Sequence, residues 1–174
     1  MPENPRIEEL RRRVQKDPAS IAFAQLAEEY RRAGSYQEAI AACRAGLTIH
    51  PGYNSARVTL GRALIEVNDL DTAEAELNQV FRNAPENLAA IRGLADVHHR
   101  RGELGDALTF YQAALGLAKH DPDLEQTVDD LSRAMTPPVT IAAQSSEVEP
   151  EPPALPELER LLEAIHSYRQ RREV

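Results

Sequence analysis

Apolar and small residues recur along this chain at a fixed spacing of 34 residues. Four sets of three positions follow this spacing: Leu26, Leu60 and Leu94; Ala27, Gly61 and Ala95; Gly34, Asn68 and Gly102; and Ala39, Ala73 and Ala107. Pro51 and Pro85 are separated by the same interval. A period of this length, with small residues at one place, Gly or Asn at another and Pro near its end, predicts an array of helical hairpins.

Each predicted hairpin has two helices joined by a tight turn. Residues 19–33 are predicted to form the first helix of the first hairpin. Gly34 ends this helix, because Gly and Asn readily adopt the left-handed conformation that closes a helix. The second helices are predicted to start near Tyr36, Leu70 and Leu104. The alanines of the fourth set mark the places where the two helices of a hairpin come close, since small side chains permit that approach.

In these positions the sequence resembles the tetratricopeptide repeat family, with three repeats at about residues 20–53, 54–87 and 88–121. The resemblance implies an all-α fold, an α-solenoid of helical hairpins that winds as a right-handed superhelix. Lys119 stands where the first two repeats have proline. We therefore expect the exit from the third repeat to be the least regular.

Two further helices are predicted at the ends of the array. Residues 5–16 form a one-faced helix that resembles the second helix of a hairpin whose first helix is missing; its apolar face carries Ile7, Leu10 and Val14. Residues 122–135 form a helix with a single apolar face, made of Leu124, Val128, Leu131 and Met135. Such a helix is what a repeat array needs to cover its last hairpin. The predicted repeat domain therefore covers residues 1–135.

The composition changes after this domain. Residues 136–154 are rich in Pro and Glu and have few large apolar residues, which predicts a flexible linker. Residues 155–174 return to helical spacing and predict an amphipathic C-terminal helix. The contact face of this tail helix is formed by Leu155, Leu158, Leu161, Leu162, Ile165 and Tyr168.

The overall charge narrows the class of partner. The net charge is -8, which argues against non-specific binding to nucleic acid, because that binding requires a positive surface. No stretch approaches the roughly 20 apolar residues of a membrane helix, and the N-terminus lacks the apolar core of a signal peptide. The chain has one cysteine, so an internal disulfide is not possible. We expect a cytoplasmic protein that binds neither nucleic acid nor membrane.

The sequence contains no catalytic motif. It lacks a Gly-rich phosphate loop, a metal-binding spacing of Cys and His, and a nucleophile in a known setting. Cys43 aligns with Leu77 and Tyr111 and is predicted to be a core residue. His98 and His99 are neighbours on a helix and point about 100° apart, so they cannot share a metal ion. The prediction is a protein that is not an enzyme and has no cofactor or metal.

The resemblance also implies a binding surface. In the tetratricopeptide repeat family, the first helices of successive repeats line a concave groove that takes a peptide or a helix. The matching residues of this chain are Ile21, Ala24, Glu28, Arg31, Ser55, Val58, Arg62, Ile65, Ala89, Arg92, Asp96 and His99. Arginine favours acidic partners, because its paired donors match a carboxylate. The alternative is that these charges form an ordinary solvated surface.

Members of the family that bind chaperone tails use a clamp of Lys, Asn and Arg. The matching positions here are Ala24, Glu28, Thr59, Ala89 and Gly93, and none is a clamp residue. The sequence therefore argues against a partner of that kind.

These observations predict a non-catalytic protein-protein interaction module, an adaptor or scaffold with a protein or peptide partner. A linker of about twenty residues reaches roughly 25 Å as a random coil, so the tail helix has the reach to dock in the protein's own groove or in that of a second copy. The alternatives are a tail helix that meets a separate partner, and a structural assembly protein that self-associates through this helix.

Overall fold

The structure is a computed structural model that describes residues 5–118 and 120–135. The predicted linker and tail helix, residues 136–154 and 155–174, lie outside the described residues. The described part is all α-helical, as the sequence predicts. Its helices are α1 (Pro5–Lys16), α2 (Ala22–Arg32), α3 (Tyr36–Ile49), α4 (Asn54–Glu66), α5 (Leu70–Asn83), α6 (Leu88–Arg101), α7 (Leu104–Leu117) and α8 (Pro122–Met135).

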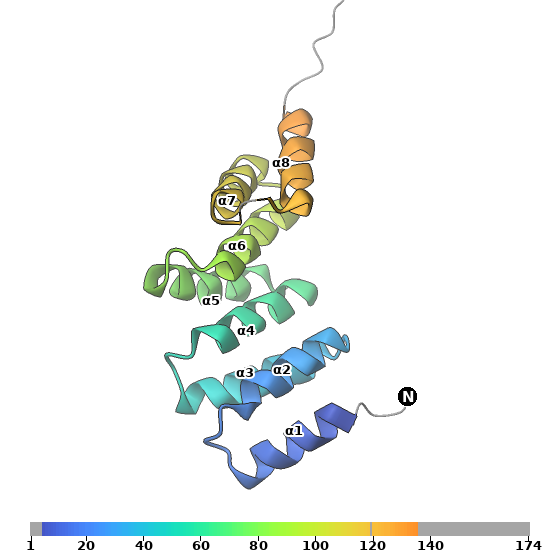
Figure 1. Ribbon diagram of the computed structural model, residues 1–174, viewed down its shortest axis with the longest axis vertical. Coiled ribbons are helices and arrows are strands. Elements are labelled where there is room, and N and C mark those ends of the chain that lie inside the picture. Colours follow the sequence, from blue (N-terminus) through green and yellow to red (C-terminus); the bar gives the residue numbers. More distant parts are fainter. Residues whose placement is uncertain (1–4, 119, 136–174) are drawn as a thin grey trace, which may run out of the picture. The chain divides into compact units, whose positions relative to one another are not determined.

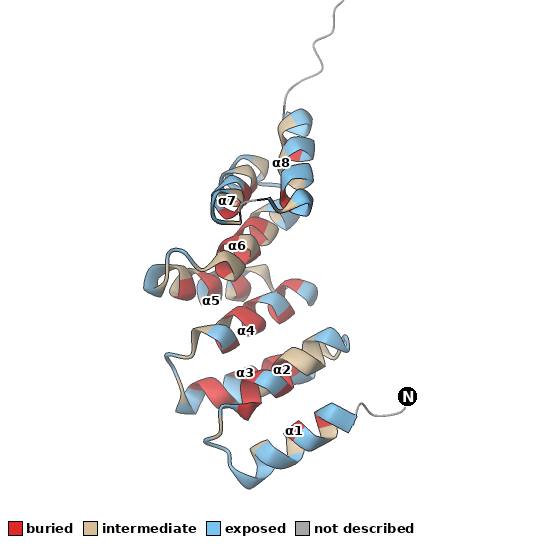
Figure 2. Ribbon diagram, viewed as in Figure 1, coloured by how far each residue is buried: buried red, intermediate tan, exposed pale blue. Residues whose placement is uncertain are grey.

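The helices form an α-solenoid (Figure 1). Each helix packs against the next one in the chain, and α4 also packs against α2 and α6. The first helices of the three hairpins, α2, α4 and α6, therefore form one layer, with α3, α5 and α7 behind them. The buried residues lie along the faces where these helices meet (Figure 2). No helix among the described residues is long and apolar enough to cross a membrane.

The turns inside the hairpins have the predicted left-handed residues. Gly34, Asn68 and Gly102 have φ angles of 77°, 61° and 79°. In each turn the next backbone N–H donates to a carbonyl in the last turn of the preceding helix, as Ser35 does to Tyr30 over 2.9 Å. These bonds satisfy carbonyl groups that a helix end leaves free. The positions chosen from the 34-residue period are confirmed.

The exit from the third hairpin differs from the other two. After α7 the chain passes through His120, whose φ is 69°. A positive φ is uncommon for a residue with a side chain. The less regular exit expected there is confirmed.

Close approach between helices depends on glycines that face large side chains. A Cβ atom on Gly46 would lie 2.1 Å from the ring of Phe23, which is buried between α2 and α3. Leu77 of α5 is inserted between two glycines, since a Cβ would lie 2.6 Å from its side chain at Gly61 and 2.9 Å from it at Gly93. The fully buried Leu77 thus joins α4, α5 and α6.

Two details of the sequence prediction are wrong. The first helix of hairpin one begins at Ala22 instead of residue 19. Asp17 accounts for this delay, because its side chain and its carbonyl accept the backbone N–H groups of Ala19 and Ser20. Met135 is 44% exposed although it was placed on the apolar face of α8. Its neighbour on α7 is Gly105, which has no side chain to cover it.

Gly46→Ala tests the close packing of Phe23. We expect the free energy of unfolding to fall by about 1–3 kcal/mol, because the added methyl group overlaps a ring that has no room to move. Gly116→Ala in α7 is the control, since no atom lies within 4 Å of its Cβ position. That change is expected to add about 0.5–1 kcal/mol through helix propensity. Urea unfolding measures both values, and equal effects would contradict the packing argument.

Candidate functional site

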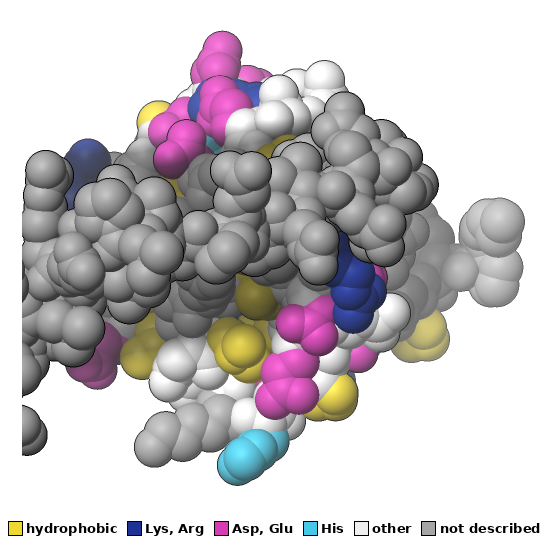
Figure 3. All heavy atoms as spheres, turned by 90° about the horizontal axis from the view of Figure 1, so that it is seen from above, with side chains coloured by type: hydrophobic (Ala, Val, Ile, Leu, Met, Phe, Trp, Pro, Cys, Tyr) yellow, Lys and Arg dark blue, Asp and Glu magenta, His cyan; other side chains and the backbone are white. Residues whose placement is uncertain are grey.

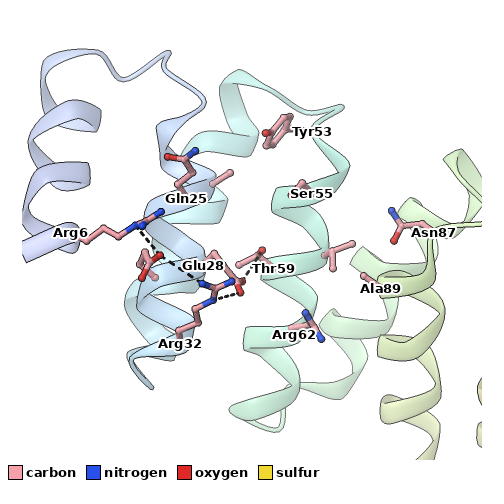
Figure 4. A pocket seen from close by; sticks show the side chains of 13 residues that line it. Arg6, Gln25, Glu28, Arg32, Tyr53, Ser55, Thr59, Arg62, Asn87 and Ala89 are labelled. Atoms are coloured by element: carbon pink, nitrogen blue, oxygen red, sulfur yellow. Dashed lines mark hydrogen bonds and ion pairs between the residues drawn. The ribbon is translucent and has the colours of Figure 1, made fainter. Parts of the chain in front are cut away.

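A cavity of about 530 Å³ opens on the layer of first helices, between α1, α2, α4 and the start of α6 (Figure 4). Six of the twelve predicted groove residues line it: Ala24, Glu28, Ser55, Val58, Arg62 and Ala89. The other lining residues are Arg6, Gln25, Glu29, Arg32, Tyr53, Thr59 and Asn87. The cavity therefore spans repeats one and two and reaches only the first turn of the third repeat's α6.

The floor of the cavity is built from small side chains. Ala24 and Val58 are 8% and 7% exposed, so they offer a shallow apolar surface. Thr59 is the one buried polar residue of the described chain, and its hydroxyl donates to the Glu28 carboxylate over 3.4 Å. Tyr53, before α4, stands with its ring edge against Phe23 at a centroid distance of 5.9 Å. The floor is thus held by core contacts.

The two acidic residues of the cavity have basic partners. Glu28 accepts two hydrogen bonds from Arg31, at 2.9 and 3.0 Å, and one from Arg32 at 3.1 Å. The Arg31 bonds, opposed by burial, hold the pKa of the Glu28 carboxyl below its usual value, so it stays ionised. Glu29 forms an ion pair with Arg6 of α1 over 3.1 Å.

Arg62 has a different environment. It lies on α4 in the middle of the cavity, and its side chain is exposed. Within residues 5–118 and 120–135 it takes part in no hydrogen bond or ion pair. No dashed line reaches it in Figure 4, whereas Arg6 and Arg32 are both joined to carboxylates. Arg62 is therefore a cation available to a ligand.

The groove positions of the third repeat are tied by internal contacts. Arg92 forms an ion pair of 2.9 Å with Asp121, the residue before α8. Asp96 accepts a hydrogen bond from the Tyr111 hydroxyl, and the His99 ring stands edge-on to Tyr111 at 6.4 Å. Of the groove positions predicted in the third repeat, only Ala89 lines the cavity, and these three do not.

The remaining predicted positions also lie outside the cavity. Arg31 donates hydrogen bonds to Glu28. Ile21, the residue before α2, is 57% exposed. Ile65 is 3% exposed, and Arg100 donates to its carbonyl over 2.7 Å. Most of the arginines on this face are paired with acidic neighbours.

Several lining residues were missed by the sequence reasoning. Arg6 comes from α1, which has no equivalent in the repeats and so gives no periodic signal. Tyr53 and Asn87 do have a signal, since they precede α4 and α6 and are 34 residues apart. Asp121 continues that series in the sequence and is the residue before α8. Extending the 34-residue period to the residue that precedes each of these helices would have found Tyr53, Asn87 and Asp121.

The chain matches the family model described as tetratricopeptide repeat over residues 58–122. The described helices thus form a solenoid of tetratricopeptide-type hairpins. The assignment agrees with the hairpins, with the left-handed turn residues, and with solved structures of the same fold.

Three solved structures illustrate the shared fold. The first tetratricopeptide repeat domain of Spaghetti (RPAP3) bound to an HSP90 peptide is 17% identical, with a TM-score of 0.63 over 67% of this chain and 93% of that one. A repeat protein of Thermus thermophilus is 23% identical, with a TM-score of 0.65 over 75% and 73%. MamA of Desulfovibrio magneticus is 18% identical, with a TM-score of 0.66 over 74% and 73%. No curated protein sequence matches the chain.

The reactive side chains of this repeat protein are engaged in packing. Cys43 is fully buried, and desolvation raises the pKa of its thiol to about 12, which leaves it protonated at neutral pH. The His98 ring stacks on Phe110 at 5.3 Å, and its Nδ1 atom hydrogen-bonds Glu103. The donor atoms of His98, Glu103 and Asp106 lie within 4.8 Å of one another, a grouping that the sequence did not predict. It closes the turn between α6 and α7.

Tyr111 provides a pH-dependent test of the tied half of the groove. Burial and the hydrogen bond to Asp96 raise the pKa of its hydroxyl above the usual value. The unfolded chain releases this proton at about pH 10 while the folded chain keeps it, so stability is retained below about pH 10 and falls above it. We expect the urea midpoint to fall between about pH 10 and 12, with a shallower fall in Tyr111→Phe. Equal slopes in the two proteins would contradict this account.

Proposed function

We propose that this repeat protein is a non-catalytic adaptor that binds a short segment of another protein, as a peptide or a helix, in the cavity across α1, α2 and α4. The observation that carries the proposal is a cavity that combines a small-residue floor with a rim of polar and charged side chains. Ligand sites in proteins commonly have this combination of concave shape and a few placed polar groups. The same fold holds an HSP90 peptide in the Spaghetti (RPAP3) domain, which supports a peptide as the class of ligand.

The composition of the cavity argues for a ligand other than that chaperone tail. Glu28 lines the cavity and carries a negative charge, and Ala24 and Thr59 supply neither cation nor amide. An acidic carboxyl terminus would need a clamp of donors at these positions. The proposed partner therefore differs from the HSP90 peptide bound by the RPAP3 domain.

Ser55→Trp tests the cavity as the binding site. The full chain is used to select binders from a displayed library of random 12-residue peptides, and affinities are measured by fluorescence anisotropy. Ser55 is exposed within the cavity, so a tryptophan there fills it without disturbing the core. We expect selected peptides to lose at least about tenfold in affinity, equivalent to about 1.4 kcal/mol.

Ala75→Trp is the matched control, because Ala75 is exposed on α5 and does not line the cavity. Peptides that bind both variants as well as the original chain would show that the cavity is not the site. A library that yields no binder would contradict the proposal itself.

The sequence of the tail suggests regulation of this adaptor. We propose that residues 155–169, tethered by residues 136–154, compete with the external ligand for the groove. The support is the apolar face of the predicted tail helix and the reach of the linker, roughly 25 Å. A protein that assembles through this helix is the competing hypothesis.

Deletion of residues 136–174 separates these hypotheses. Docking predicts a lower thermal midpoint and faster hydrogen exchange in α2 and α4 after deletion. Self-assembly predicts dimers that depend on concentration and are lost on deletion, as measured by light scattering. No change in thermal midpoint, mass or exchange would contradict both roles for the tail.

A further inference from the structure

The cavity carries a small positive charge although the whole chain is acidic. Its lining includes three arginines, Arg6, Arg32 and Arg62, and two glutamates, Glu28 and Glu29, which gives 3 - 2 = +1. Both glutamates are bound by arginines, as described above. The chain as a whole has a net charge of -8. The cavity therefore differs in the sign of its charge from the chain as a whole.

We propose that the groove selects an acidic segment and that Arg62 binds the carboxylate of this segment. The segment is confined to the α1–α2–α4 part of the surface, because Asp121 holds Arg92 and keeps it from binding the segment. This inference rests on the proposed peptide-binding function and specifies the chemistry of the ligand.

Repeat symmetry indicates why Arg62 is the recognition residue. Glu28, Arg62 and Asp96 occupy the same position in successive repeats, 34 residues apart. The two acids could neutralise the arginine between them, but Glu28 binds Arg31 and Arg32, and Asp96 binds Tyr111. The carboxylate that Arg62 lacks within the described chain is thus left for the ligand to provide. A guanidinium can hold it with two parallel hydrogen bonds.

A basic ligand would find no equivalent partner in the cavity. A lysine placed near Arg62 would meet a like charge, and both nearby carboxylates already have arginine partners. The small side chains of the floor, Ala24, Val58 and Ala89, leave room for apolar groups beside the acidic one. The segment that fits is therefore acidic at one position and small or apolar around it.

The charges at the C-terminal end of the array keep an acidic segment on the α1–α2–α4 part of the surface. Arg92 lies one turn after Ala89 on α6 and would extend the basic surface, but it is held by Asp121 at 2.9 Å. Helix α8 adds exposed Asp123, Glu125, Asp129 and Asp130 against the single Arg133. Acidic side chains are prominent on the described surface in Figure 3, where the array is seen from above. An acidic ligand is repelled there and attracted at Arg62.

Charge-defined peptide pools test the role of Arg62. The probes are three fluorescein-labelled pools of 12-residue peptides with mixed Ala, Leu and Ser, in which the central residue is Glu, Gln or Lys. The full chain is expected to bind the Glu pool about tenfold more tightly than the Gln pool, as one charge-assisted hydrogen-bond pair would give. Arg62→Gln is expected to bring this ratio close to one. Arg82→Gln, at an exposed arginine on α5, is expected to keep it.

The outcomes separate the two proposals. Equal binding of all pools, or preference for Lys, overturns the acidic selectivity while peptide binding stands. A preference for Glu that Arg62→Gln leaves unchanged overturns the role of Arg62. Absence of binding by every pool and by the random library overturns both proposals.

Asp121→Asn tests the confinement. The asparagine keeps the cap of α8, because Asp121 Oδ1 accepts the Leu124 N–H over 3.2 Å and Asn caps helices equally well. It removes the negative charge that holds Arg92. We expect a pool with two Glu residues to bind several-fold more tightly to this variant, and the gain to disappear in the double variant Arg92→Gln, Asp121→Asn. Unchanged or weaker binding to Asp121→Asn, with an unchanged melting temperature, overturns the confinement.

Discussion

The insertion of Leu77 between Gly61 and Gly93 sets the spacing of the three helices α4, α5 and α6. A side chain larger than hydrogen at either glycine would overlap Leu77, so α4 and α6 approach each other at a distance that depends on this residue. Helix α4 also carries Ser55, Val58, Thr59 and Arg62, which line the cavity. Because packed interiors respond to changes of even one methyl group, the shape of the binding surface depends on a contact that no ligand touches.

The same position has a different side chain in each repeat. It is Cys43 in the first, Leu77 in the second and Tyr111 in the third. The tyrosine is long enough to reach past the core and donate its hydroxyl to Asp96 on the groove side. The smaller residues end within the core. One change of side-chain length at an equivalent position therefore accounts for part of the difference between an open groove in repeats one and two and a tied groove in repeat three.

The 34-residue period predicted the helices and turns well, because the repeated residues are those that the backbone conformation of each turn requires. Gly34, Asn68 and Gly102 have a conformation that few residues adopt, so their recurrence locates each turn closely. The groove was predicted less completely. Which arginines remain available depends on long side chains that meet across helices, such as Arg92 with Asp121 and Arg6 with Glu29. Such pairs follow no period, and an exposed pair contributes so little energy that sequence spacing does not reveal it. Helix α1 shows the same limit, since its Arg6 reaches the cavity from outside the repeats.

The nearest-neighbour arrangement of the helices also has a consequence for how the protein folds. Among the described helices, each one packs only against helices one or two places away in the chain, so these contacts are local and the entropy lost in closing loops is small. Arrays of this kind can begin to fold in any repeat and extend from there. Leu77 joins helices of two adjacent repeats, which makes the centre of the array the natural starting point. Within the part of the chain that the structure describes, α1 and α8 each pack against one helix, and they are expected to form last and to open first.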